Sequence, residues 1–229
     1  MSPIRLLVSN HFTEISGMSE ANEGLDLRCF EGGPLATNGY AFKAPGGWVA
    51  VDAPQGMADW ADKEGIDPQL LILTHQHFDH VQGAAGLVES FGCPIWAFSQ
   101  YDKDLTLEDF FRGLEGTGFE IAPYRVGRIL EQEIGDGLDI LGCQIDLLHI
   151  PGHSPDSICF VMEGEDIVFG GDVLFRSGIG RTDFPGGDTD LLLDGIREKL
   201  FSLNEASAVL PGHGMATTIG RERRENTFL

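Results

Sequence analysis

The chain is most constrained by one short stretch, residues 74–80, which has the sequence Thr-His-Gln-His-Phe-Asp-His. Three histidines and one aspartate lie within six residues of it. The apolar run before it, residues 70–73, predicts a buried strand, and residues 81–90 after it predict a helix. The stretch is therefore expected to be a strand-to-helix loop held at both ends, which is a common position for functional groups. Four adjacent polar side chains are hard to bury unless each has a partner, so metal binding is favoured over a core role.

Three further potential ligands each come directly after a short apolar run that predicts a strand: His153, Asp172 and His213. Because strand ends gather along one edge of a parallel or mixed sheet, we expect these residues to meet the histidine loop there. Pro-Gly precedes both histidines. Proline stops a strand and glycine permits the turn that orients the ring, so both positions favour a functional role.

Strands and helices alternate in the middle of the chain, which predicts a layered α/β architecture. The expected strands include residues 25–30, 37–43, 48–51, 94–98, 157–162, 166–170 and 208–210, with several more within 121–150. Helices are expected at residues 57–63 and 190–201. Residues 100–117 predict a helical insertion, which is either a solvated cap or part of a lid. Residues 1–24 give no clear prediction.

Length and composition predict an ordinary cytoplasmic protein with one domain spanning residues 1–229, although two small domains are possible. No apolar run approaches the roughly 20 residues of a membrane span, and the N-terminus lacks the plan of a signal peptide. The four cysteines have no paired spacing, which favours reduced thiols. A net charge of −21 disfavours nucleic acid as a partner. Oligomeric state is not predicted.

Histidine and carboxylate together suit zinc, iron or manganese. One tetrahedral zinc uses about four ligands, whereas this chain offers more. A larger set fits two divalent ions that share a bridging carboxylate and a bridging hydroxide, which is hydrolase chemistry. We interpret His149, which lies inside an expected strand, as structural. The predicted metal ligands are His75, His77, Asp79, His80, His153, Asp172 and His213.

In this order and spacing, the motifs resemble the metallo-β-lactamase superfamily from about residue 25 to the end of the chain. The resemblance implies an αββα sandwich, in which two mixed β-sheets are flanked by helices. It implies one ion bound by His75, His77 and His153. It also implies a second ion bound by Asp79, His80 and His213, with Asp172 bridging the two. Asp52 matches an acidic position of the superfamily, where it would orient a metal ligand without binding the metal itself.

Within that superfamily, residues 171–175, 178–183 and 217–223 resemble the short bacterial branch of the glyoxalase II group, which hydrolyses thioesters of glutathione. Longer members carry a C-terminal helical domain with cationic contacts to glutathione. Sixteen residues follow His213 here, so we expect that domain to be absent. Arg181 stands where longer members have a glutathione-binding lysine, and Asp183 where they have a tyrosine.

The sequence therefore predicts a metal-dependent thioesterase with zinc as the favoured metal and iron or manganese as alternatives. Its substrate would be a small acyl thioester of the glutathione type or a related one. Asp79 would orient the attacking water or accept its proton. Arg181, with Arg221 or Arg224, would hold a substrate carboxylate, although all three could equally be surface charges.

Two alternatives remain open at this stage. A persulfide dioxygenase with one iron shares these motifs, including the run at residues 180–184. A metal-stabilised binding or regulatory protein without turnover belongs to another class, and the large donor set disfavours it.

Asp156 also departs from the resemblance, because glycine is usual at this position, and it adds a charge near the site.

Overall fold

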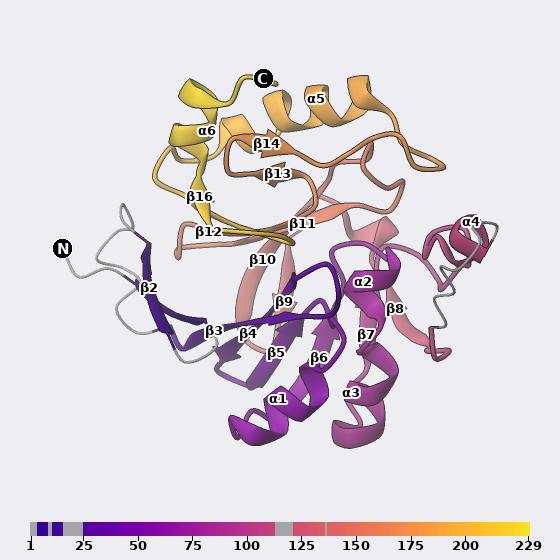
Figure 1. Ribbon diagram of the computed structural model, residues 1–229. Coiled ribbons are helices and arrows are strands. Elements are labelled where there is room, and N and C mark those ends of the chain that lie inside the picture. The colour runs from indigo at the N-terminus through magenta and orange to yellow at the C-terminus, as the bar shows by residue number, and fades with distance from the viewer. Residues whose placement is uncertain (1–3, 9–10, 16–24, 113–120, 136) are drawn as a thin grey trace.

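Two β-sheets pack face to face with helices on both outer faces, in a computed structural model that describes residues 4–8, 11–15, 25–112, 121–135 and 137–229 (Figure 1). Each sheet contains both parallel and antiparallel strand pairs. The predicted αββα sandwich is thereby confirmed.

The first sheet has eight strands in the order β2-β1-β3-β4-β5-β6-β7-β8 among the described residues. Its strands are β1 (Ile4–Val8), β2 (His11–Ile15), β3 (Leu27–Gly32), β4 (Thr37–Ala44), β5 (Gly47–Val51), β6 (Pro68–Ile72), β7 (Ile95–Ala97) and β8 (Val126–Ile129). β5 and β6 are buried along most of their length, because one sheet face meets the other sheet and the other meets helices.

The second sheet has the order β16-β15-β12-β11-β10-β9. Its strands are β9 (Leu138–Ile140), β10 (Cys143–His149), β11 (Ile158–Met162), β12 (Ile167–Gly171), β15 (Ala208–Pro211) and β16 (Thr217–Thr218). A separate hairpin, β13 (Leu174–Phe175) with β14 (Gly178–Ile179), follows β12.

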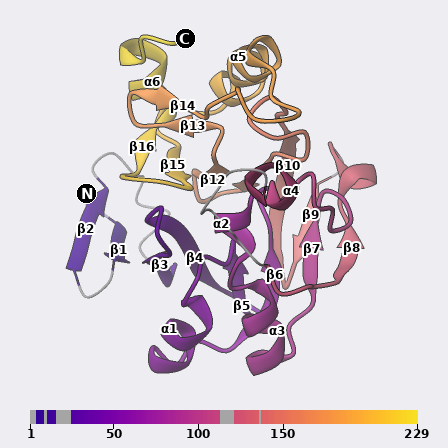
Figure 2. The ribbon, with the colours of Figure 1, turned by 45° about the vertical axis from the view of Figure 1, so that its right-hand side comes forward.

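Helices cover the outer face of each sheet (Figure 2). The first sheet carries α1 (Met57–Lys63) and α3 (Ala84–Phe91), and the second carries α5 (Thr189–Glu198) and α6 (Ile219–Glu225). The remaining helical elements are α2 (Phe78–Val81), α4 (Glu108–Arg112), η2 (Glu131–Glu133) and η3 (Leu200–Ser202). No helix in the described ranges is long and apolar enough to cross a membrane.

Packing between the sheets forms the central core, in which the ring of Phe42 stacks on that of Phe169 at 5.5 Å between centroids. Each such fully buried side chain contributes about 1.5–3 kcal/mol of transfer free energy. On the outer face, α5 buries Leu192 and Ile196, four residues apart on one side of the helix. The side chain of Asp188 caps its first turn by accepting a hydrogen bond from the Leu191 amide.

Two sequence predictions differ from the structure. The single helix expected at residues 81–90 is two helices that meet at Gly83. This glycine packs against the connection between β5 and α1: a Cβ there would lie 2.5 Å from the Pro54 carbonyl oxygen. In the expected insertion at 100–117, α4 is the one helix among the described residues, since Leu107 adopts a left-handed backbone (φ 61°) just before it. Residues 113–117 lie outside the described ranges.

The strand ends of both sheets meet along one edge. In the first sheet, β5 and β6 run parallel, and Asp52 and His75 follow their carboxyl ends. In the second sheet, β12 and β15 also run parallel and lead to Asp172 and His213. A hydrogen bond from the Ile158 amide to the Thr74 carbonyl joins the two edges. The topology thus brings distant parts of the chain to one place.

Candidate metal centre

All seven predicted metal ligands lie together at this edge. Donor atoms that approach within 4.8 Å of one another form three overlapping groups: His75, His77 and His153; His75, His80 and Asp172; Asp79, His80 and His213. The first and third groups have the composition implied by the superfamily resemblance.

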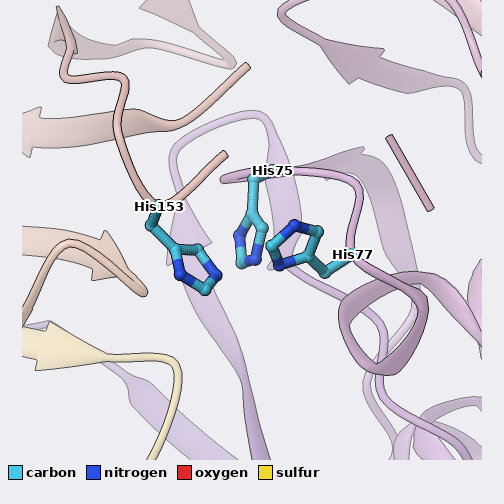
Figure 3. Close-up of side chains that lie close together, drawn as sticks. All are labelled: His75, His77 and His153. Carbon is cyan, nitrogen blue, oxygen red and sulfur yellow. The ribbon is translucent and has the colours of Figure 1, made fainter. Parts of the chain in front are cut away.

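The first group consists of three buried imidazoles that face a common space (Figure 3). The ring centroids of His77 and His153 lie 4.4 Å apart, and those of His75 and His77 4.6 Å apart. Burial, followed by the charges of neighbouring histidines, holds the pKa of His75 and of His77 well below the usual value. Burial also lowers the pKa of His153. These histidines are therefore neutral and present free electron pairs, as metal ligation requires.

The other group combines carboxylates with histidines. Asp79 Oδ2 lies 3.2 Å from His213 Nε2 and 3.6 Å from His80 Nε2. Burial opposes ionisation of Asp79, but attraction to His80 and the hydrogen bond with His213 outweigh it and lower the Asp79 pKa to about 2. Burial likewise opposes protonation of His213, yet its contacts with Asp172 and Asp79 raise the pKa to about 10.

Asp172 lies between the two groups. Its Oδ1 atom is 3.3 Å from His80 Nε2, and its Oδ2 atom is 3.5 Å from His153 Nε2 and 3.4 Å from His213 Nε2. One carboxylate thus reaches histidines of both groups, which is the arrangement expected of a bridging ligand.

Asp52 fixes the histidine loop from behind. Its Oδ2 atom lies 2.8 Å from His80 Nδ1 and accepts a 2.7 Å hydrogen bond from Thr74 Oγ1. Its Oδ1 atom accepts a bond from the Thr74 amide. Thr74 Oγ1 also lies 3.1 Å from His75 Nδ1. One buried carboxylate therefore orients two of the ligand rings, in the role that the resemblance implied.

Backbone carbonyls orient two more rings. His153 Nδ1 lies 2.7 Å from the Arg181 carbonyl oxygen, and His213 Nδ1 lies 3.2 Å from that of Leu35. A carbonyl accepts only, so Nδ1 carries a proton in both rings and Nε2 faces the centre. In His153, whose pKa is lowered, Nε2 presents its electron pair there. Sequence reasoning missed both carbonyls, because a backbone acceptor leaves no signature in residue type.

Unpaired buried atoms test whether the residues fit a metal. His75 Nε2, His80 Nε2, His153 Nε2 and Asp172 Oδ1 are buried without a hydrogen-bond partner. Leaving such groups unpaired costs about 1–3 kcal/mol each, so a ligand for them is expected. Space is also reserved there: a Cβ on Gly212 would lie 2.1 Å from Asp172 Oδ1 and 2.5 Å from His80 Cε1. The residues therefore fit divalent ions.

A cavity of about 490 Å³ opens onto the centre. Polar ligands form its floor, and its lining includes Leu35, Phe78, Leu107, Phe111, Phe175, Ile179, Arg181 and Phe184. Phe111 belongs to the insertion that the sequence predicts as a cap or a lid, and Phe184 ends the run at residues 180–184. A cavity lining was not predicted for either, since an isolated phenylalanine is indistinguishable from a core residue.

The three predicted substrate-binding arginines occupy different positions. Arg181 lines the cavity. Arg221 does not line it and pairs with Glu225 at 3.0 Å on α6. Arg224 pairs with Glu205 at 3.1 Å. A substrate contact by Arg221 or Arg224 stays a prediction, with both side chains engaged elsewhere.

Asp156 and His149 lie outside the ligand groups. His149 Nε2 is 2.8 Å from the Pro155 carbonyl and its ring stacks on Phe98, in agreement with a structural role. Asp156 is buried and belongs to a polar cluster behind the loop. It accepts hydrogen bonds from Ser154 Oγ at 2.5 Å and from Gln76 Nε2 at 3.3 Å.

Comparisons with known proteins agree with this geometry. A model of the metallo-beta-lactamase superfamily matches residues 32–213. The Haemophilus influenzae protein named hydroxyacylglutathione hydrolase GloC is 43% identical over 165 residues, 72% of this chain and 77% of that protein. The crystal structure of BLEG-1 B3 metallo-beta-lactamase gives a TM-score of 0.77 at 32% identity, covering 89% of this chain and 99% of that one. The crystal structure of TTHA1623 in a di-iron-bound form gives a TM-score of 0.71 at 35% sequence identity. The match covers 86% of this chain and 97% of that one.

Proposed function

This chain belongs to the metallo-beta-lactamase superfamily, and from that premise we propose that it is a thioesterase that hydrolyses small acyl thioesters at a dinuclear metal centre. One observation supports it above the others: Asp172 reaches histidines of two ligand groups beside an open cavity. The named activity of the Haemophilus relative is hydrolysis of a thioester of this type, which supports the same substrate class.

His75, His77 and His153 would hold one divalent ion, Asp79, His80 and His213 the other, and Asp172 both. Zinc is favoured by the donor set, and the di-iron form of a relative keeps iron, besides manganese, as an alternative. Such ions supply Lewis acidity toward a carbonyl oxygen and lower the pKa of a water molecule. The thioester is a suitable substrate because a thiolate leaves without strong acid assistance.

The chain's own residues position the reacting groups. Thr37 Oγ1 donates a 2.6 Å hydrogen bond to Asp79 Oδ2, which fixes this carboxylate at the cavity floor. From there Asp79 would orient the attacking water or accept its proton. Asp52 and the two backbone carbonyls hold the imidazoles, so that little reorganisation is needed during reaction.

The decisive experiment is purification without added metal, elemental analysis, and assay of thioesters, a lactone and a β-lactam. We expect about two ions per chain and hydrolysis of at least one thioester. Asp172→Ala should lose metal and activity, while Glu89→Ala, a matched removal of an exposed carboxylate on α3, should retain both. Normal activity in Asp172→Ala would refute the dinuclear model.

The same experiment tests the alternatives. One iron per chain with oxygen consumption on a persulfide would establish the dioxygenase instead. The presence of a complete second donor group supports two ions over one. A fully loaded protein that hydrolyses nothing in the panel would favour a binding protein without turnover.

We also propose that the protein works in the cytoplasm. All four cysteines are free, and Cys29, Cys93 and Cys159 are buried. Burial raises the pKa of the Cys29 and Cys159 thiols to about 12. Inert reduced thiols of this kind support a reducing compartment.

A further inference from the structure

The cavity beside the ligand groups has a continuous aromatic wall. Phe184 stands edge-on to His77 with 5.6 Å between ring centroids, and its ring lies 5.8 Å from that of Phe111. Phe111, on α4, lies 5.3 Å from Phe78 in the histidine loop. The wall thus extends from His77, a predicted metal ligand, to α4. Leu35, Phe175 and Ile179 add further apolar surface to the lining.

Positive charge in the lining is already neutralised. Arg181 is the one cationic side chain among the described residues that line the cavity, leaving the histidine ligands aside. Its Nε and Nη2 atoms donate to the two carboxylate oxygens of Asp183 at 2.7 and 2.6 Å. Its guanidinium carbon lies 4.0 Å from the Phe184 ring centre, so the cation stacks on this one ring of the wall. An anionic ligand must displace Asp183 to reach both donors.

We propose that this cavity binds the apolar, aliphatic or aromatic acyl group of its thioester, and that Asp183 disfavours acidic carrier thiols such as glutathione. The inference rests on the proposed thioesterase function and names its substrate class. An acyl chain of four to eight carbons fits well within a cavity of this volume and would lie along Phe111 and Phe184. Asp183 would then be a specificity-determining residue.

Binding of thioethers tests the inference without any reaction. The probes are S-methyl, S-butyl and S-hexyl derivatives of glutathione and of neutral N-acetylcysteamine, titrated calorimetrically into the metal-loaded protein. We expect about three- to fourfold tighter binding for each buried methylene. The neutral series should bind at least as tightly as the glutathione series. A flat dependence on chain length would overturn the apolar assignment.

Two variants separate the wall from the charge. Phe111→Ala should reduce the gain per methylene, whereas Phe228→Ala, a matched truncation of an exposed ring near the C-terminus, should not. Asp183→Asn frees Arg181, and because an exposed ion pair is worth up to about fivefold in affinity, glutathione thioethers should gain about that factor. The neutral series should stay within about twofold. A wild-type preference of tenfold or more for glutathione, unchanged in Asp183→Asn, would overturn the role of Asp183.

Hydrolysis of the matching thioesters, measured in parallel, separates this inference from the proposed function. Turnover without a chain-length trend would retain the thioesterase and reject the apolar cavity. Tight, length-dependent thioether binding without turnover of any thioester would retain the cavity and reject the enzyme.

Discussion

Asp156 carries a buried charge that should cost stability at neutral pH. The side chain is 2% exposed and accepts hydrogen bonds from Ser154 and Gln76. Gln76 in turn accepts a 2.8 Å hydrogen bond from the Tyr124 hydroxyl. Burial outweighs these hydrogen bonds and raises the Asp156 pKa from 3.8 to about 6. The change to test is Asp156→Asn, which removes the charge and keeps the shape.

The magnitude follows from the shift in pKa. A rise from 3.8 to about 6 is about two pKa units, and each unit is 1.36 kcal/mol, so the total is about 3 kcal/mol. Since the folded pKa is the higher one, the folded state holds the proton between pH 4 and 6 while the unfolded state has lost it. The free energy of unfolding therefore falls by about 3 kcal/mol as the pH rises through this window, and is constant above it. Asp156→Asn lacks this loss.

The assay is urea unfolding of the metal-free proteins in chelator at pH 4 and pH 7. The free energy of unfolding of Asp156→Asn minus that of wild type should rise by about 3 kcal/mol from pH 4 to pH 7. Other titrating groups cancel in this difference, as does any constant change in hydrogen bonding. Asp59→Asn, on the exposed side of α1, serves as the matched control and should show no comparable gain. A difference that stays flat with pH would refute the desolvation argument.

Three further substitutions test the support of the centre. Asp52→Asn should weaken metal binding or activity by about 10–100-fold, because the 2.8 Å contact orients His80; unchanged metal content and turnover would contradict this. Gly212→Ala should abolish metal binding, because its Cβ would lie 2.1 Å from an Asp172 oxygen. Elemental analysis of the folded variant measures this, and a normal metal content would contradict it. Tyr124→Phe should lower the free energy of unfolding by about 1 kcal/mol through loss of its hydrogen bond to Gln76, measured by urea unfolding; no change would contradict it.

The sequence could predict that the seven candidate ligands lie together, because each follows a strand and the strand ends of parallel pairs meet at one edge. His153 and His213 are separated from the histidine loop by long segments, yet Pro-Gly before each marks them. The alternation of strands and helices predicted a layered α/β architecture, and the superfamily resemblance implied the sandwich itself.

The surroundings of the ligands could not be predicted in the same way. Arg181 and Asp183 are two residues apart, but their ion pair depends on side-chain rotamers that no sequence pattern specifies. Leu107 has a left-handed backbone, which leucine rarely adopts and which no sequence pattern marks. The helical insertion predicted at residues 100–117 is therefore longer than α4, the helix that the structure describes there. Glu222 is an acid with no exposed surface, paired with Thr217 and the Ser177 amide, and its role was not apparent from a charged C-terminal segment.

The predicted metal ligands come from both sheets, so a bound ion would also have a mechanical role. His75 and His80 follow the first sheet, whereas Asp172 and His213 follow the second, and each ion would join side chains from both. An ion that binds the folded chain but not the unfolded chain would then cross-link the two sheets. It would stabilise their packing by an amount set by the free concentration of the ion and its affinity. Metal supply would thereby set the fraction of chains that is folded, as well as catalytic competence.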